Sequence, residues 1–290
     1  FDLKSQVEEQ KTEIEDKNHK IEDQLRVLEQ KNKQIQNYNA ELLDSLRYAK
    51  RLQDSIFSSD QDLQRYFPES FVYSQPKEIV GGDFCWVVRH ESQIVMVLAD
   101  CTGHGVPGAF MSIVGYNQLQ QIILQDKTTS PGVILARLDK AMRDAVSHSE
   151  TTAMKDGMDV SVCTYDPENR TLRFAGAFHS LFLVRERELR EIKGSRFTAG
   201  VYFGATEKHF EEHKIAVEPE DVVYMMSDGI QDQFGGPYDN KLMKKGLRAI
   251  LMEIHEEALD EQRDLLASRV NQWMGGHEQI DDILAVGIKF

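Results

Sequence analysis

The first 57 residues contain neither glycine nor proline, and this stretch constrains the fold more than any other feature of the chain. Glycine and proline are the residues that interrupt helices most strongly, so a long run without them favours one continuous helix. A seven-residue apolar repeat within such a run is typical of a left-handed coiled coil. Apolar residues recur at every seventh position here: Val7, Ile14, Ile21, Leu28, Ile35, Leu42, Ala49 and Ile56.

The a positions of this repeat, which would form the second row of contacts with a partner helix, are half polar. Asparagine in such a seam favours two helices paired in register and weakens the pairing. We therefore expect residues 1–57 to form a homodimeric coiled coil, with a single solvated helix as the alternative. If the recurring apolar residues occupy d positions, the a positions hold Lys4, Lys11, Asn18, Leu25, Asn32, Asn39, Leu46 and Gln53.

The apolar stripe becomes wider between Leu42 and Phe57, where leucines also occupy positions 43 and 52. A wide stripe suits a helix that contacts a second surface in addition to its partner. We expect this part of the helix to dock on the domain that follows and to carry a signal into it.

Charge and cysteine content restrict the classes of function. The chain has 34 Lys and Arg against 48 Asp and Glu, a net charge of −14, whereas nucleic-acid binding requires a basic surface. Three cysteines are too few for a disulfide framework, which favours a reducing compartment, and we expect a cytoplasmic location for residues 58–290. No signal peptide or membrane-spanning run is evident. Because the repeat is already under way at Phe1, we expect a longer protein whose missing N-terminal part carries a sensor or membrane domain.

Residues 58–290 have the pattern of an α+β domain, in which several strands are grouped as hairpins. Expected strands cover residues 71–73, 82–88, 94–100, 158–165, 171–175, 181–184, 213–217, 222–226 and 283–289. Expected helices cover residues 107–125, 131–147, 241–256 and 259–274, and Pro107 and Pro131 suit their first turns. Strands that outnumber helices in this way favour antiparallel sheets covered by helices.

Four aspartates share one setting in this second region: Asp83, Asp100, Asp228 and Asp281 each lie at an end of an expected strand, beside glycine or another aspartate. A single aspartate of this kind is usually a turn residue or a helix cap. Four together predict an oxygen-rich site for a hard cation such as Mg²⁺ or Mn²⁺. Two such ions about 3.5–4 Å apart hold and acidify a bridging water, so that phosphate hydrolysis needs no protein nucleophile.

The order of motifs in about residues 65–290 resembles the metal-dependent protein phosphatases (PPM, the type 2C class), and in particular their bacterial SpoIIE-like branch. The resemblance implies an α-β-β-α sandwich of two stacked antiparallel sheets flanked by helices. It also implies two divalent cations, Mn²⁺ or Mg²⁺, and hydrolysis of phosphoserine or phosphothreonine on a protein. The matching segments are VGGDF (80–84), DCTGHGVPGA (100–109), DGMD (156–159), FAGA (174–177), SDG (227–229) and DD (281–282).

Residue roles follow from this resemblance. Asp100 would bridge both metals, Asp83 would bind one ion, and Asp228 and Asp281 the other, with the carbonyl of Cys101 completing the set. Animal members place a histidine, a proposed acid for the leaving group, two residues after the bridging aspartate.

Thr102 stands at that position here, and His104 lies two residues further on. His104 is thus a candidate catalytic residue, with a role in stabilising the turn as the alternative.

Two further signals have ordinary explanations. Asp159 supports the site or simply begins a strand, and we favour the strand. His209 to His213 spell a zinc-peptidase pattern, but the residues that follow alternate like a strand, which favours a solvent-facing stretch.

We therefore predict a coiled-coil helix at residues 1–57 followed by a PPM-type serine/threonine phosphatase domain at 58–290. The expected substrate is a phosphorylated regulatory protein, and in bacterial relatives it is often an anti-sigma-factor antagonist. The alternative is a non-catalytic dimeric scaffold that binds a phosphoprotein. The presence of all four aspartates argues against the scaffold, because a domain that only binds has no need of them.

Overall fold

A computed structural model describes residues 3–146, 156–201 and 208–290 of the 290-residue chain. The chain divides into two compact units, Phe1–Ala49 and Lys50–Phe290. The end of the predicted helix 131–147 falls at Ser147, outside the described residues.

Helix α1 runs from Leu3 to Ile56 without interruption, as the absence of helix breakers predicts. Its recurring apolar residues from Val7 to Leu42 are each 53% to 59% exposed in the single chain. These side chains therefore form an apolar row that the chain itself leaves open to solvent. Among the described residues, no helix combines the length and the apolar character that crossing a bilayer requires.

The second unit contains two five-stranded antiparallel sheets. One sheet has the order β2-β3-β4-β5-β8, and the other has the order β1-β12-β9-β6-β7. The strands of the first sheet are β2 (Phe84–His90), β3 (Gln93–Cys101), β4 (Met158–Asp166), β5 (Thr171–Ala177) and β8 (His213–Ala216). Those of the second are β1 (Ser70–Gln75), β12 (Ile283–Lys289), β9 (Val222–Met226), β6 (Leu181–Arg185) and β7 (Glu188–Ile192).

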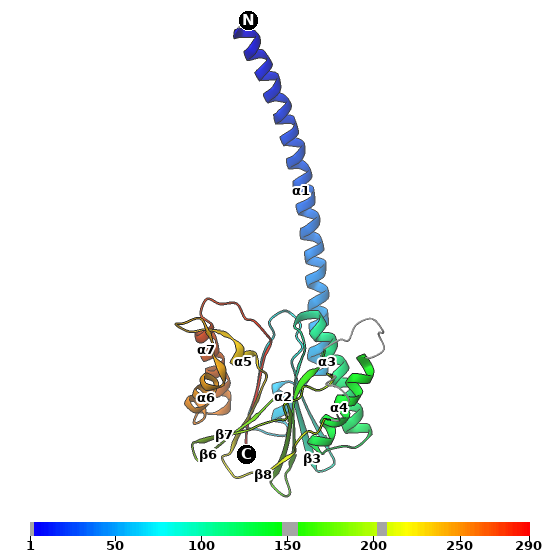
Figure 1. The fold of residues 1–290 in the computed structure, drawn as a ribbon, viewed down its shortest axis with the longest axis vertical. Coiled ribbons are helices and arrows are strands. Elements are labelled where there is room, and N and C mark those ends of the chain that lie inside the picture. The colour runs from blue at the N-terminus through cyan, green and yellow to red at the C-terminus, as the bar shows by residue number, and fades with distance from the viewer. Residues whose placement is uncertain (1–2, 147–155, 202–207) are drawn as a thin grey trace. The chain divides into compact units, whose positions relative to one another are not determined.

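Helices cover the outer face of each sheet, so the unit has four layers (Figure 1). The first sheet is covered by α3 (Gly105–Gln120), its π-helical continuation η1 (Gln121–Gln125) and α4 (Pro131–Val146). The second is covered by α6 (Met243–Ile254) and α7 (Leu259–Met274). Short elements complete the unit: α2 (Asp60–Gln64), α5 (Gly229–Asp232), and the hairpin of β10 (Phe234–Gly235) with β11 (Asn240–Lys241).

Strand β3 shows how the sequence produces these layers. Successive side chains of a strand point to opposite faces, and both faces of this strand are apolar. Val95, Val97 and Ala99 pack against the outer helices. Met96 and Leu98 pack between the two sheets. Such a strand has no polar face, which is why residues 94–99 form a continuous apolar run.

The predicted α-β-β-α sandwich is confirmed, and all nine expected strands and four expected helices are present. Strand β7 was not predicted, because Ile192 is the only fully buried residue of this edge strand. The short elements α2, α5, β10 and β11 were also not predicted. Their two to five residues are too few to establish a periodic pattern.

Candidate active site

The strand topology brings the four predicted aspartates to one end of the sandwich. Asp83 directly precedes β2 and Asp100 is the penultimate residue of β3, and these two strands pair in register. Asp228 follows β9 by two residues and Asp281 lies just before β12, which pairs with β9. Each sheet thus contributes two of the four carboxylates.

Asp100 is the aspartate on which the charges of the others act. Burial raises the pKa of its carboxyl group well above the ordinary value, and the nearby charges of Asp83, Asp228, Asp281 and Asp159 raise it further. Asp100 in turn affects the pKa values of Asp83 and Asp228, so these carboxyl groups lie close to one another. Carboxylates held this close repel one another unless protons or cations are shared between them.

The Oδ2 atom of Asp83 is buried and has no hydrogen-bond partner. Burial raises the pKa of this carboxyl group, and the neighbouring charges of Asp282 and Asp281 add to the effect. A buried carboxylate oxygen without a donor is costly, and a cation is one of the few partners that stabilise it.

No group of three or more His, Cys, Asp or Glu side chains in the described parts of the chain is already arranged to hold a metal ion. The donor set nevertheless fits hard divalent cations, because it consists of crowded carboxylates with an unpartnered oxygen.

Asp159 is the second residue of β4, so the prediction that it begins a strand is confirmed. It also pairs directly with Asp100 of β3, which places it beside the candidate site. Burial, together with the charge of Asp228, raises the pKa of its carboxyl group to about 6. The pairing register of β3 and β4 produces this proximity, and the local sequence does not reveal it.

Asp282 fixes the turn before Asp83. Its Oδ1 accepts from the backbone N–H of Lys77 at 2.8 Å, and its Oδ2 accepts from that of Gly82 at 2.6 Å. A Cβ atom on Gly81 would lie 2.6 Å from Oδ2 of Asp282, so only glycine fits there. The two members of the Asp281–Asp282 pair differ in setting: Asp282 is buried in this turn, whereas Asp281 is half-buried and its Oδ1 accepts from the backbone N–H of Asp282 at 2.9 Å.

Cys101 presents its backbone and its side chain to different surroundings. A Cβ on Gly82 would lie 3.0 Å from the carbonyl oxygen of Cys101, so this carbonyl faces the turn that leads to Asp83. The thiol is buried in the core between the first sheet and its helices, where burial raises its pKa well above the ordinary value. The thiol is thus a packing group.

His104 forms the N-cap of α3 and is held on both sides. Lys77 Nζ lies 2.9 Å from its Nε2, and Glu78 Oε1 lies 2.7 Å from its Nδ1. An ammonium group can only donate, so Nε2 accepts and Nδ1 carries the proton that Glu78 binds. In this arrangement the nitrogen that faces Lys77 has no proton to give to a leaving group.

The last turn of α1 contacts the segment around Asp83, and both belong to the second unit. Gln53 Nε2 donates to the carbonyl oxygen of Gly81 at 2.9 Å and lies 3.2 Å from Ser112 Oγ of α3. Phe57 stacks on Phe84, with ring centroids 4.6 Å apart.

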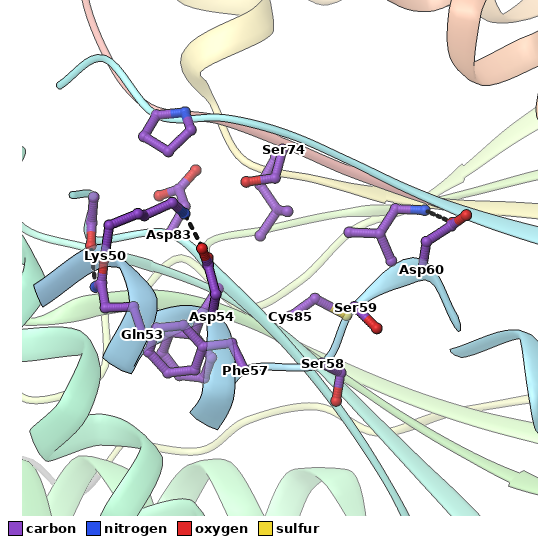
Figure 2. Close-up of a pocket in the computed structure, with 15 residues that line it drawn as sticks. Lys50, Gln53, Asp54, Phe57, Ser58, Ser59, Asp60, Ser74, Asp83 and Cys85 are labelled. Atoms are coloured by element: carbon purple, nitrogen blue, oxygen red, sulfur yellow. Dashed lines mark hydrogen bonds and ion pairs between the residues drawn. The ribbon is translucent and has the colours of Figure 1, made fainter. Parts of the chain in front are cut away.

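Figure 2 shows Gln53, Phe57 and Asp83 around a cavity of about 420 Å³. The helix end thus holds the residues on both sides of Asp83.

Comparison with known proteins identifies the fold. The model of the family "SpoIIE: Stage II sporulation protein E" matches residues 90–290. The SiaA PP2C domain of Pseudomonas aeruginosa has a TM-score of 0.79 and 29% identity, over 87% of this chain and 98% of that one. No curated protein sequence matches the chain.

Two more distant structures share the fold. The PP2C phosphatase domain of SpoIIE from Bacillus subtilis, with a fragment of its regulatory domain, has a TM-score of 0.60 and 19% identity, over 76% of this chain and 61% of that one. RsbX in complex with magnesium has a TM-score of 0.53 and 15% identity, over 76% of this chain and 94% of that one. The family match covers more than half of the chain, which therefore belongs to the SpoIIE family and is a serine/threonine protein phosphatase of the PP2C class.

Proposed function

We propose that this phosphatase hydrolyses phosphoserine or phosphothreonine on a regulatory protein with a water activated by two divalent cations, Mn²⁺ or Mg²⁺. The observation that carries the proposal is the position of Asp100, which pairs with Asp159 in the sheet and lies close enough to Asp83 and Asp228 for their charges to raise its pKa. Magnesium in the RsbX structure, which shares this fold, supports the choice of metal.

The proposed ligands divide between the two ions. Asp100 would be shared by the two ions, Asp83 and the carbonyl of Cys101 would hold one of them, and Asp228 and Asp281 would hold the other. Bound cations of this kind lower the pKa of a bridging water and neutralise the charge of a phosphate. The protein's own contribution is to keep the carboxylates close together and partly shielded from solvent. This crowding costs free energy, which is why the pKa values of Asp83 and Asp100 are raised.

His104 acts in this proposal by holding Lys77, and not as a proton donor. Lys77 is tied to the site through its backbone, because its N–H donates to Asp282. Its ammonium group donates to a neutral imidazole nitrogen. A phosphate approaching so acidic a site requires positive charge nearby, and Lys77 is placed to provide it.

Residues 1–57 provide dimerisation and control. The apolar row on α1 is open to a second copy of the same helix, and its seven-residue spacing suits a parallel coiled coil. Movement of this helix would reach the site through Gln53 and Phe57, which contact the residues beside Asp83. An upstream sensor domain is the natural source of such movement. The proposed substrate is a small regulatory domain of the anti-sigma-factor-antagonist kind.

Calorimetric titration with Mn²⁺ tests the metal site separately from catalysis. We expect the wild-type chain to bind Mn²⁺ and Asp83→Asn to bind it at least tenfold more weakly. Asp23→Asn, a change on the exposed part of α1, serves as the control and should bind like wild type. A wild-type chain that binds no Mn²⁺ or Mg²⁺ would refute the proposal.

A further inference from the structure

A buried histidine beside Asp100 has no assigned role. His179 lies between β5 and β6, where the chain passes from the first sheet to the second. Its side chain is 5% exposed, and neither ring nitrogen has a hydrogen-bond partner. Buried polar groups are almost always paired in native proteins, so an imidazole with two unpaired nitrogens calls for an explanation.

The backbone around His179 is fixed by close packing. Phe178 has a φ of 65°, which is uncommon for a residue other than glycine, and its N–H donates to the carbonyl of Ser195 at 2.8 Å. Gly176 and Gly194 both lie against the carbonyl oxygen of His179, where a Cβ atom on either would overlap that oxygen. A strained residue and two closely packed glycines therefore fix the backbone of His179.

The ring is aimed at the centre of the site. Nε2 of His179 lies 3.9 Å from Oδ2 of Asp100, about 1 Å longer than an N–H···O hydrogen bond. A cavity of about 40 Å³, which Asp228 and Lys244 also line, borders the ring. An imidazole carries an N–H at Nε2 in one of its two tautomers, so this nitrogen can donate a hydrogen bond.

We propose that His179 is a positioning residue, whose Nε2–H donates to Oδ2 of Asp100 and sets which carboxylate oxygens face the cations. The charges that act on Asp100 are those of other carboxylates, so a hydrogen-bond donor supplies an orientation that these acids cannot. Hydrogen bonds from outer residues to ligating groups commonly change metal affinity 10- to 100-fold. This inference rests on the proposed function of Asp100 as a metal ligand.

A matched pair of variants separates hydrogen bonding from packing. His179→Gln keeps an N–H donor near the position of Nε2, whereas His179→Phe keeps the ring shape without any donor. We expect His179→Phe to weaken Mn²⁺ binding about tenfold in calorimetry and to lower kcat with little change in KM. His179→Gln should stay within about threefold of wild type.

Thermal unfolding without metal provides the control. His179→Phe should melt at the wild-type temperature or above, because it removes two unpaired buried nitrogens. His179→Met, also without a donor, replaces it if the phenylalanine variant does not fold. Wild-type Mn²⁺ affinity and kcat in a folded donor-free variant would overturn the inference. A wild-type chain that binds no metal would instead overturn the proposed metal site itself.

Discussion

Gln53 Nε2 donates a hydrogen bond to the carbonyl oxygen of Gly81 at 2.9 Å, two residues before Asp83. Gln53 also occupies an a position of the seven-residue repeat and is buried, whereas most of the repeat is exposed in the single chain. The a positions of the repeat thus end in a residue that contacts the turn before Asp83. This contact is the most direct path from α1 to the proposed metal ligands.

Replacing Gln53 should affect the site as well as stability. Gln53→Ala leaves a buried carbonyl oxygen without its donor, which typically costs about 1–3 kcal/mol. We also expect the Mn²⁺ concentration for half-maximal activity to rise about tenfold, because the turn before Asp83 loses its support. Ser55→Ala, on the exposed side of the same turn of α1, is the control. An unchanged Mn²⁺ requirement in Gln53→Ala would argue against this path.

The turn at Gly81 should not tolerate a side chain. A Cβ atom there would lie 2.6 Å from Oδ2 of Asp282, so Gly81→Ala should destabilise the protein by about 1–3 kcal/mol and lower phosphatase activity strongly. Gly276→Ala introduces the same atom where no atom lies within 4 Å, and should change stability by less than about 0.5 kcal/mol. Denaturant unfolding of the two variants measures the difference, and equal effects would contradict the described packing.

The stability of the metal-free protein should fall as pH rises, in part because of Asp159. Its pKa is about 6 in the folded chain and 3.8 as the ordinary value, so the folded state binds the proton more tightly. Its favourable contribution is complete below pH 4 and is lost as pH rises through about 6. Asp159→Asn should remove this part of the pH dependence, on the order of 1–3 kcal/mol. If the free energy of unfolding changes with pH in the same way in wild type and Asp159→Asn, this prediction is wrong.

The loss of kcat on replacing His104 distinguishes a proton donor from a residue that only holds Lys77. A general acid contributes about 10²–10⁴-fold to the rate, whereas a residue that only holds Lys77 contributes less. We expect His104→Gln to lose less than tenfold in kcat, since His104 Nε2 accepts from Lys77 in the structure. A loss above a hundredfold in a folded variant, measured with a phosphoserine peptide, would establish the proton donor instead.

The exposed apolar row of α1 predicts a dimer. Sedimentation equilibrium should give twice the chain mass of 33.2 kDa at tens of micromolar. Ile21→Asp places a charge in the middle of the row and should shift the chain towards monomer without changing the phosphatase fold. A wild-type monomer throughout this concentration range would remove the coiled-coil interpretation for these residues.

Periodic patterns made much of this fold predictable. Helix α7 and strands β9 and β12 begin and end at the predicted residues, because apolar spacing and flanking glycines or acids mark their limits. Edge strand β7 has too few buried residues to leave such a pattern. Local sequence thus specifies elements that bury a whole face, and leaves short or exposed ones undetermined.

The site was predictable only in part, for a different reason. Its aspartates at strand ends carry a local signal, since each lies beside glycine or another acid. His179 and Gln53 carry no such signal. His179 follows an ordinary strand, and Gln53 looks like a polar position of a coiled coil. Their proximity to Asp100 and Gly81 arises from strand crossing and helix docking, which no local pattern encodes.

Phosphate release from a phosphoserine peptide, with and without Mn²⁺, for wild type and Asp100→Asn side by side, tests the central claim most directly. Asp100→Asn keeps the size of the side chain and removes the charge that would bridge the cations. We expect the wild type to release phosphate only with Mn²⁺ present. The rate of release should fall at least a thousandfold in a folded Asp100→Asn variant. Near-full activity in Asp100→Asn, or wild-type activity that is independent of divalent cations, would contradict it.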